Sequence, residues 1–210
     1  MELSRRGFVT KGTAIISGTF YNRHEAFSNP NIRKTMSRPL IISTWPFGEA
    51  ANKKAMEVIN SGGSSLDAVE KGINVTENDK ENTSVGIGGL PNSEGIVQLD
   101  ACIMNGPEHE AGSVMGLEKI RNPISVARKV MEHTRHVQLV GKGAQKFACS
   151  QGFIKENLLT EKSKKKWLEW KKDNQKKRLE GSSENHDTIA LLILDEDGNL
   201  TGGCSTSGLA

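Results

Sequence analysis

The junction Asn185-His186-Asp187-Thr188-Ile189 places a hydroxyl at the first residue of an apolar run, directly after a polar segment. An internal threonine is a poor nucleophile because its hydroxyl is barely acidic and has no obligatory base beside it. If the bond before Thr188 were cut, the new α-amine, with an ordinary pKa of about 7.7–8.0, would serve as that base. Asp187 would hold or deprotonate the hydroxyl, which would then attack the Asp187 carbonyl. Taken alone, however, His-Asp-Thr before a strand is more often a polar turn with a cap-like aspartate.

The elements around this junction predict a hairpin. Residues 188–194 form a buried strand, residues 195–199 contain an Asp-Gly turn, and residues 200–205 form the returning strand. The hairpin would hold Thr188 at the start of a strand, where a nucleophile is positioned by the sheet.

The rest of the chain alternates between strand and helix patterns, which indicates an α/β or α+β protein, and we expect the α+β class. Ser64 or Ser65 is expected to cap the second helix. We expect strands at residues 39–44, 95–104, 111–114 and 136–141, helices at 50–60, from 65 onward, at 123–133 and 143–151, and a flexible loop at 86–91.

Residues 1–38 are expected to precede the folded domain as an export signal and linker. The segment begins Ser4-Arg5-Arg6-Gly7-Phe8 and continues into a weakly apolar stretch, which resembles a twin-arginine signal. Export to the periplasm is therefore expected, and the alternative is a disordered basic tail on a cytoplasmic protein. No run approaches the roughly 18 apolar residues that a membrane span needs.

The net charge of +3 conceals two basic segments on an acidic body. Residues 1–38 hold seven basic and two acidic residues, and residues 161–178 hold nine and three, which leaves twelve basic and twenty acidic residues elsewhere. The lysine-rich stretch, with Trp167 and Trp170, suits either a solvated helical segment or binding to an acidic polymer. Because no basic face accompanies it, we favour the solvated segment and expect no nucleic-acid partner.

Three cysteines, Cys102, Cys149 and Cys204, form no CxxC pair and show no metal-ligand spacing with histidine. At most one disulfide can form within the chain, and ordinary buried thiols are the favoured interpretation. We expect no metal and no organic cofactor, because the chemistry at Thr188 requires neither.

Several motifs together resemble the glycosylasparaginase (aspartylglucosaminidase) family of N-terminal-nucleophile hydrolases. The resemblance runs from about residue 39 to the end of the chain, in family order. It rests on the junction at 186–189 and on the segments Ser43-Thr-Trp-Pro-Phe-Gly48, Leu66-Asp-Ala-Val-Glu-Lys-Gly72, Ser84-Val-Gly86, Leu99-Asp-Ala-Cys-Ile-Met104, Asn122-Pro-Ile-Ser-Val-Ala-Arg128 and Cys204-Ser-Thr-Ser-Gly208.

The resemblance implies a four-layer αββα fold and a precursor that cleaves itself between Asp187 and Thr188. Residues 39–187 would be the α-chain part and residues 188–210 the start of the β chain. The mature enzyme would hydrolyse the amide that links N-acetylglucosamine to asparagine, with Thr188 as nucleophile and base and Thr206 supporting its hydroxyl. Trp45 would line the substrate site and Ser84 would belong to its shell. A homodimer of αβ units is implied as well.

The family's β chain continues far beyond the predicted hairpin, and it supplies groups that bind the substrate and stabilise the oxyanion. For 210 residues alone we therefore expect poor folding, an exposed sheet edge beside the Thr188 strand, and no useful turnover. The alternatives are a non-catalytic remnant, or a related hydrolase of asparagine or small β-aspartyl amides.

Overall fold

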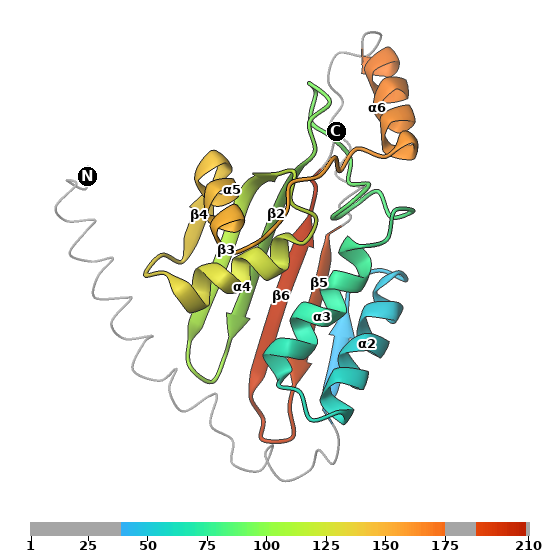
Figure 1. The fold of residues 1–210 in the computed structure, drawn as a ribbon. Helices are drawn as coiled ribbons and strands as arrows, with labels where there is room; N and C mark the ends of the chain where they lie inside the picture. The colour runs from blue at the N-terminus through green and yellow to red at the C-terminus, as the bar shows by residue number, and fades with distance from the viewer. Residues whose placement is uncertain (1–38, 175–187, 209–210) are drawn as a thin grey trace, which may run out of the picture. The chain divides into compact units, whose positions relative to one another are not determined.

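A computed structural model of the chain describes residues 39–174 and 188–208. Its central feature is a mixed six-stranded sheet in the order β1-β5-β6-β2-β3-β4 (Figure 1). All neighbouring strands pair antiparallel except β3 and β4, which pair parallel. The strands are β1 Leu40–Ser43, β2 Gln98–Asn105, β3 Glu110–Glu118, β4 Gln138–Val140, β5 Ile189–Leu194 and β6 Leu200–Thr206.

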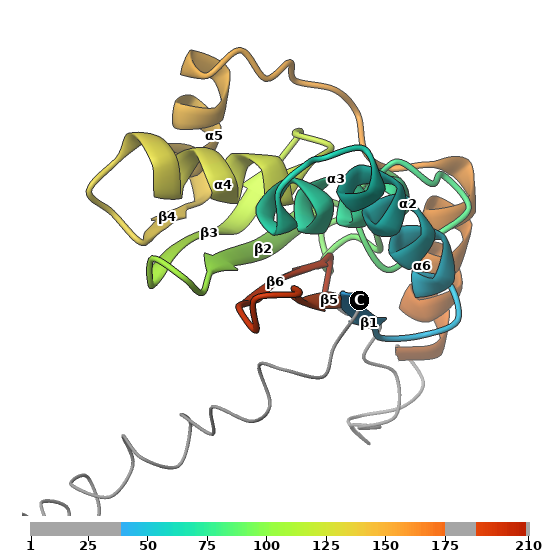
Figure 2. The ribbon, with the colours of Figure 1, turned by 90° about the horizontal axis from the view of Figure 1, so that it is seen from below.

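Helices α2 to α5 cover one face of this sheet (Figure 2). Helix α6 lies beyond one end of the sheet and contacts the loops there (Figure 1). The helices are α2 Gly48–Asn60, α3 Ser65–Glu77, α4 Pro123–His133, α5 Gly141–Ser150 and α6 Glu161–Asn174. The α+β class expected from the sequence is confirmed.

The packing of α2 against α3 follows from local sequence. Ser64 caps α3 in a capping box, because its hydroxyl accepts from the Asp67 N–H while the Asp67 side chain accepts from the Ser64 N–H. A β-carbon on Gly72 would lie 2.9 Å from the Ala51 carbonyl oxygen, so a glycine lets the two helices approach closely. Of the two expected caps, Ser64 and Ser65, the structure shows Ser64.

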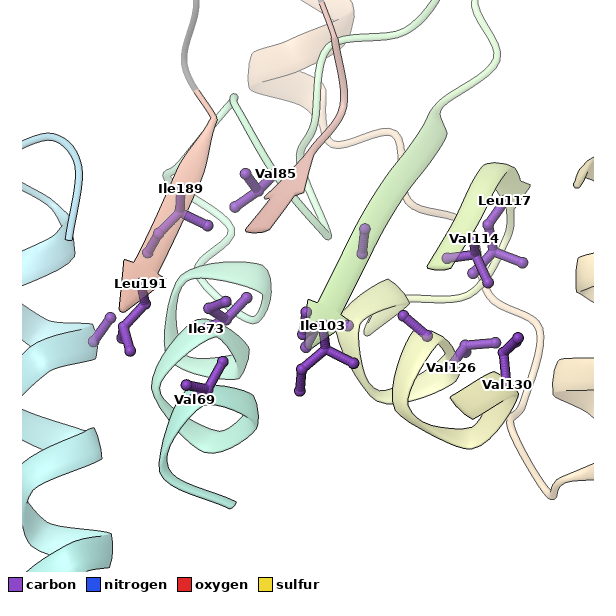
Figure 3. Close-up of a cluster of buried hydrophobic side chains, with 14 of the residues drawn as sticks. Val69, Ile73, Val85, Ile103, Val114, Leu117, Val126, Val130, Ile189 and Leu191 are labelled. Carbon is purple, nitrogen blue, oxygen red and sulfur yellow. The ribbon is translucent and has the colours of Figure 1, made fainter. Parts of the chain in front are cut away.

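The core lies between the helices and the sheet (Figure 3). Alternate residues of β5, namely Ile189, Leu191 and Ile193, are fully buried on the helix side, where they meet Val69 and Ile73 of α3 in one cluster. Burial of each such side chain contributes about 1.5–3 kcal/mol. The strand that begins after Thr188 is thus anchored in the core by three fully buried side chains.

The opposite face of the sheet, which we call the open face, is covered by no helix or strand among the described residues (Figure 2). Its apolar side chains are exposed, with 52% of Ile42 and 54% of Leu200 accessible. A contiguous apolar surface of this kind marks a contact surface or a risk of aggregation. The open face carries Leu40, Ile42, Cys102, Met104, Met115, Leu192, Leu200 and Cys204.

The expectation of an exposed edge beside the Thr188 strand was wrong. β5 lies between β1 and β6 and is paired on both sides, and β1 is the edge strand. Residues 40–43 pair with residues about 150 positions later in the chain, and that pairing leaves no local signal in the sequence. The apolar surface that the structure leaves exposed is the open face of the sheet and not an edge beside β5.

The loop at 86–91 was expected to be flexible, but residues 83–89 are all buried. The Ile87 N–H donates to the Glu77 carbonyl at 2.9 Å and the Gly88 N–H donates to the Leu158 carbonyl at 2.8 Å. Gly86 has φ +59°, and a β-carbon there would lie 2.1 Å from the Glu77 carbonyl oxygen. These glycines serve close packing against the end of α3, and not mobility.

Other boundaries moved by a few residues. β2 begins at Gln98 and not at 95, β3 extends to Glu118, and β4 is limited to three residues because α5 starts at Gly141. The expectation of buried thiols was also wrong, because Cys102 and Cys149 are exposed and Cys204 is half-buried.

Arg128 of α4 joins three carboxylates and ties α4 to α3. Its Nη1 lies 2.6 Å from Asp67 Oδ1 and 2.8 Å from Glu70 Oε2, and its Nε lies 2.6 Å from Glu132 Oε1. Burial acts to lower the pKa of Arg128, but its hydrogen bonds to the three carboxylates outweigh this effect and raise the pKa above its usual value. The guanidinium therefore offsets the repulsion between three acidic groups.

Replacing Arg128 with methionine is expected to lower the free energy of unfolding by about 2–3 kcal/mol, because partly buried carboxylates lose their counter-charge. Urea unfolding followed by circular dichroism measures this loss. Lys54→Met removes an exposed ion pair to Glu57 and serves as the control, with an expected change below about 0.5 kcal/mol. Equal losses in the two variants would contradict the assignment.

Candidate functional site

Thr188 lies directly before the first residue of β5 and is half-buried. Its carbonyl accepts a hydrogen bond from Thr44 Oγ1 at 2.7 Å, and the same hydroxyl accepts from the Ala190 N–H at 2.9 Å. The Thr44 N–H donates to the Ala190 carbonyl at 3.0 Å. The end of β1 thus fixes the backbone on both sides of Ile189, and with it the position of Thr188.

Thr206, the last residue of β6, lies opposite Thr188 in register. Ile189 pairs with Ser205, so continuing the antiparallel register by one residue brings Thr188 against Thr206. Ser205 points to the buried helix side, and alternation therefore places Thr206 on the open face. Asp100 of β2 is the next residue in the same row.

Trp45 and Ser84 line one depression of about 450 Å³ at the same end of the sheet, with Pro46, Phe47, Asp79, Glu81, Asn82 and Thr83. Trp45 directly follows Thr44, which holds Thr188. The buried Ser84 accepts two hydrogen bonds at its carbonyl from Ser207, at 2.8 Å from the N–H and at 2.9 Å from the hydroxyl. Ser207 in turn directly follows Thr206.

The structure therefore gathers four of the five predicted site residues at one end of the sheet: Thr188, Thr206, Trp45 and Ser84. The fifth, Asp187, lies outside the described residues. A larger depression of about 530 Å³, lined by residues 95–97, Lys119 and residues 155–159, contains none of them.

Trp45 has a left-handed backbone, with φ +63°, and the residue is 47% exposed. This conformation costs a residue other than glycine or asparagine about 1–2 kcal/mol. Strain of this kind concentrates at functional sites, because the surrounding structure must impose it. An exposed indole held at such a cost is consistent with contact to a ligand.

Trp45→Asn is expected to keep the free energy of unfolding within about 1 kcal/mol of the wild-type value, because asparagine tolerates the left-handed conformation. Urea unfolding measures it. Phe47→Asn is the control and should lose about 2 kcal/mol or more, since Phe47 packs against the core. A comparable loss for Trp45→Asn would mean that the indole is structural.

Sequence reasoning missed two residues, Thr44 and Glu77. Thr44 was part of a recognised motif, but its side-chain bonds to residues about 145 positions later cannot be read from the chain. Glu77 follows Val69 and Ile73 at intervals of four residues, so it falls on the apolar stripe of α3. An acidic residue on a core stripe was the available signal.

Glu77 is fully buried and accepts four hydrogen bonds. Oε1 accepts from the Ile124 N–H at 3.0 Å and from Ser205 Oγ at 2.8 Å, and Oε2 accepts from Asn122 at 3.1 Å and Asn74 at 3.0 Å. Burial raises the pKa of Glu77 to about 7 from an ordinary value of 4.5, although the hydrogen bonds oppose the shift. The carboxyl group joins α3, the start of α4 and the strand that carries Thr206.

The raised pKa of Glu77 predicts a pH-dependent stability. The folded carboxyl binds its proton more tightly than the unfolded one, so its contribution is fully present below pH 4.5 and is lost as pH rises through 7. The unfolding free energy of wild type minus that of Glu77→Gln should fall by about 3 kcal/mol between pH 4 and pH 8. A difference that is constant or rises with pH would refute this.

The lysine-rich segment is helical in α6, as the solvated interpretation predicted for part of it. Lys162 lies 3.0 Å from the Glu81 carboxylate, Lys166 donates to Thr83 Oγ1 at 2.9 Å, and Lys171 lies 4.6 Å from the centre of the Trp167 ring. Trp167 also packs against Gly95. The Trp167 ring therefore packs against the loop at Gly95 and under Lys171, so it is not a free stacking platform.

Metal-ligand clusters are absent from the part of the chain that the structure describes, where no three or more His, Cys, Asp or Glu side chains gather to hold an ion. Within the same residues, no helix is long and apolar enough to cross a membrane.

The chain has a layer of helices on a mixed sheet and a threonine directly before a central strand, and its sequence matches a known family of hydrolases. Residues 31–210 match the asparaginase family, and the chain belongs to it. It is 50% identical over 212 residues to N(4)-(beta-N-acetylglucosaminyl)-L-asparaginase of Elizabethkingia miricola, an alignment that covers 100% of this chain and 62% of that relative.

The enzymes of the same name from Rattus norvegicus and Mus musculus are 38% and 36% identical, over 86% of this chain and 60% of each relative. The chain thus spans about three-fifths of the length of these curated relatives. The resemblance found in the sequence motifs is confirmed.

Proposed function

We propose that the protein is a self-processing amidohydrolase that cleaves the amide between N-acetylglucosamine and asparagine. The observation that carries this proposal is the position of Thr188 directly before β5, where Thr44 holds its carbonyl, opposite Thr206 and at the end of the sheet that carries the Trp45–Ser84 depression. The names of the relatives support the choice of substrate.

In the processing step, the Thr188 hydroxyl attacks the Asp187 carbonyl and the peptide bond to the Thr188 nitrogen breaks. The resulting ester is hydrolysed by water, which leaves a carboxylate on Asp187 and a free α-amine on Thr188. That amine then accepts the hydroxyl proton in the second reaction, so one residue supplies nucleophile and base.

In the substrate reaction, the Thr188 oxygen attacks the side-chain carbonyl of the glycosylated asparagine. The glycosylamine leaves with a proton, and a β-aspartyl ester remains on Thr188 until water releases aspartate. Thr206 supports the nucleophilic hydroxyl, Trp45 contacts the substrate and Ser84 shapes the depression.

We further propose that a second sheet packs on the open face in a four-layer αββα arrangement, because exposed apolar side chains occupy that face. The described residues that line the Trp45–Ser84 depression include Asp79 and Glu81 but no cation to bind a substrate carboxylate. We therefore expect the 210-residue protein to turn over slowly, because the described lining residues offer no group to hold that carboxylate. Export through the twin-arginine-like segment and assembly into a homodimer of αβ units belong to the same proposal.

The test is hydrolysis of aspartylglucosamine by the 210-residue protein, measured as released aspartate against a Thr188→Ala control. Slow release that the control lacks is the expected result. A faster release from a simple β-aspartyl amide would favour the related amide hydrolase. If both proteins gave identical traces with both substrates and the chain stayed uncut, the proposal would fail.

A further inference from the structure

Cys102 of β2 and Cys204 of β6 face each other across neighbouring strands. They are direct register partners, and their sulfur atoms lie 3.4 Å apart. Their sequence neighbours Ala101, Ile103 and Ser205 are buried on the helix side, so both thiols point to the open face. Cys102 is exposed and Cys204 is half-buried.

This geometry is close to that of a disulfide. Directly opposed residues of antiparallel strands have Cα atoms about 4.5–5.5 Å apart, which lies within the range of about 4.4–6.8 Å found across disulfides. The sulfurs need only approach to about 2.05 Å, a change that side-chain rotation can supply.

The contact between the two thiols also favours the reactive, deprotonated form of Cys102. The hydrogen bond from Cys204 lowers the pKa of the Cys102 thiol to about 6, and the same contact raises the pKa of Cys204. An exposed thiolate at neutral pH is the species that attacks a disulfide reagent.

We propose that Cys102 and Cys204 form a reversible disulfide between β2 and β6. The oxidant is a disulfide of the small-molecule or protein class. The Cys102 thiolate attacks one of its sulfurs and releases one thiolate, and Cys204 then loses its proton and attacks Cys102 Sγ, releasing the second. The two protein thiols lose two electrons in total, and the oxidant becomes two thiols.

Cys149 cannot take part in this bond. It belongs to α5, which packs on the helix side of β3, whereas both partner sulfurs lie on the open face. The fold therefore selects one of the three pairings that the sequence allows. Oxidation takes place while the open face is accessible.

One consequence rests on the proposed self-cleavage. Cys102 would lie in the fragment that ends at Asp187 and Cys204 in the fragment that begins at Thr188. The disulfide would then tether the two fragments covalently and hold Thr206, two residues after Cys204, against β2.

The test uses the 210-residue protein with Cys149→Ser, incubated with oxidised glutathione, unfolded and treated with iodoacetamide. The expected product has lost about 2 Da and takes up no alkyl group, whereas the reduced protein takes up two. Cys102→Ser in the same background cannot close the bond and should keep its remaining thiol alkylatable or glutathionylated.

Persistence of two alkylatable thiols, or of a stable glutathione adduct on Cys102, would overturn the proposal. Peptide mapping of the oxidised wild-type protein gives an independent reading, in which any linkage through Cys149 or between molecules would also overturn it. Both readings apply to an uncut chain, so a failure of self-cleavage leaves this test intact. In a cleaved chain, the small fragment should separate only under reducing conditions.

Discussion

Thr188→Ala is expected to abolish self-cleavage, with a loss of at least about a thousand-fold in rate. Alanine keeps the backbone that Thr44 holds but has no hydroxyl to attack the Asp187 carbonyl. Denaturing gel electrophoresis over several days measures the remaining intact chain. An alanine variant that is cut at the wild-type rate would show that another group or a contaminating protease breaks the bond.

Two further variants test separately whether cleavage needs the hydroxyl of residue 188 and whether it needs the hydrogen bond from Thr44. Thr188→Ser keeps a hydroxyl and should cleave, because serine offers the same nucleophile. Thr44→Val keeps the side-chain shape but removes the hydrogen bond to the Thr188 carbonyl, and should slow cleavage about tenfold. A valine variant with unchanged rate would show that Thr44 shapes the strand without positioning Thr188 for reaction.

Glu77→Leu is expected to lower the free energy of unfolding by about 4 kcal/mol or more. Leucine leaves the Ile124 N–H and the Ser205 hydroxyl unpaired in a buried site, at roughly 1–3 kcal/mol each, and the Asn74 and Asn122 amides each lose one of their two acceptors. Urea unfolding at pH 5, where the wild-type carboxyl group is largely protonated, measures the loss without the cost of a buried charge.

Glu57→Leu provides the control for this substitution, because Glu57 forms only an exposed pair with Lys54 and should cost less than about 0.5 kcal/mol. Ser205→Ala removes a single donor and should cost about 1–2 kcal/mol even where the leucine variant cannot be purified. If Glu77→Leu were as stable as its control, the carboxyl group would not be the link between the helices and β6.

Local features of the chain were predicted well. The hairpin of β5 and β6 follows from an apolar run, an Asp-Gly turn and a second strand, and all three signals lie within residues 188–206. The Ser64 cap and the helices that flank it depend on neighbouring residues only. Because the signals for these elements come from neighbouring residues, the sequence is sufficient to predict their type and their approximate position in the chain.

Long-range features could not be predicted. The pairing of β1 with β5 and of β2 with β6 depends on which strands meet after collapse. The hydrogen bonds from Thr44 to Thr188 and Ala190 and the Cys102–Cys204 contact depend on the same long-range pairing. Composition was misleading for the loop at 86–91, where glycines indicate flexibility but Gly86 permits close packing against the end of α3. The site residues were found through motif resemblance, and their common location became visible only in the sheet.

In the proposed mechanism, Thr188 becomes a chain terminus by its own chemistry. The most direct measurement is intact mass combined with N-terminal sequencing of the purified 210-residue protein after incubation. We predict two products, one ending at Asp187 and one that begins Thr188-Ile189-Ala190. A single intact chain of 22.9 kDa, or a cut elsewhere such as in the lysine-rich segment, would contradict the account.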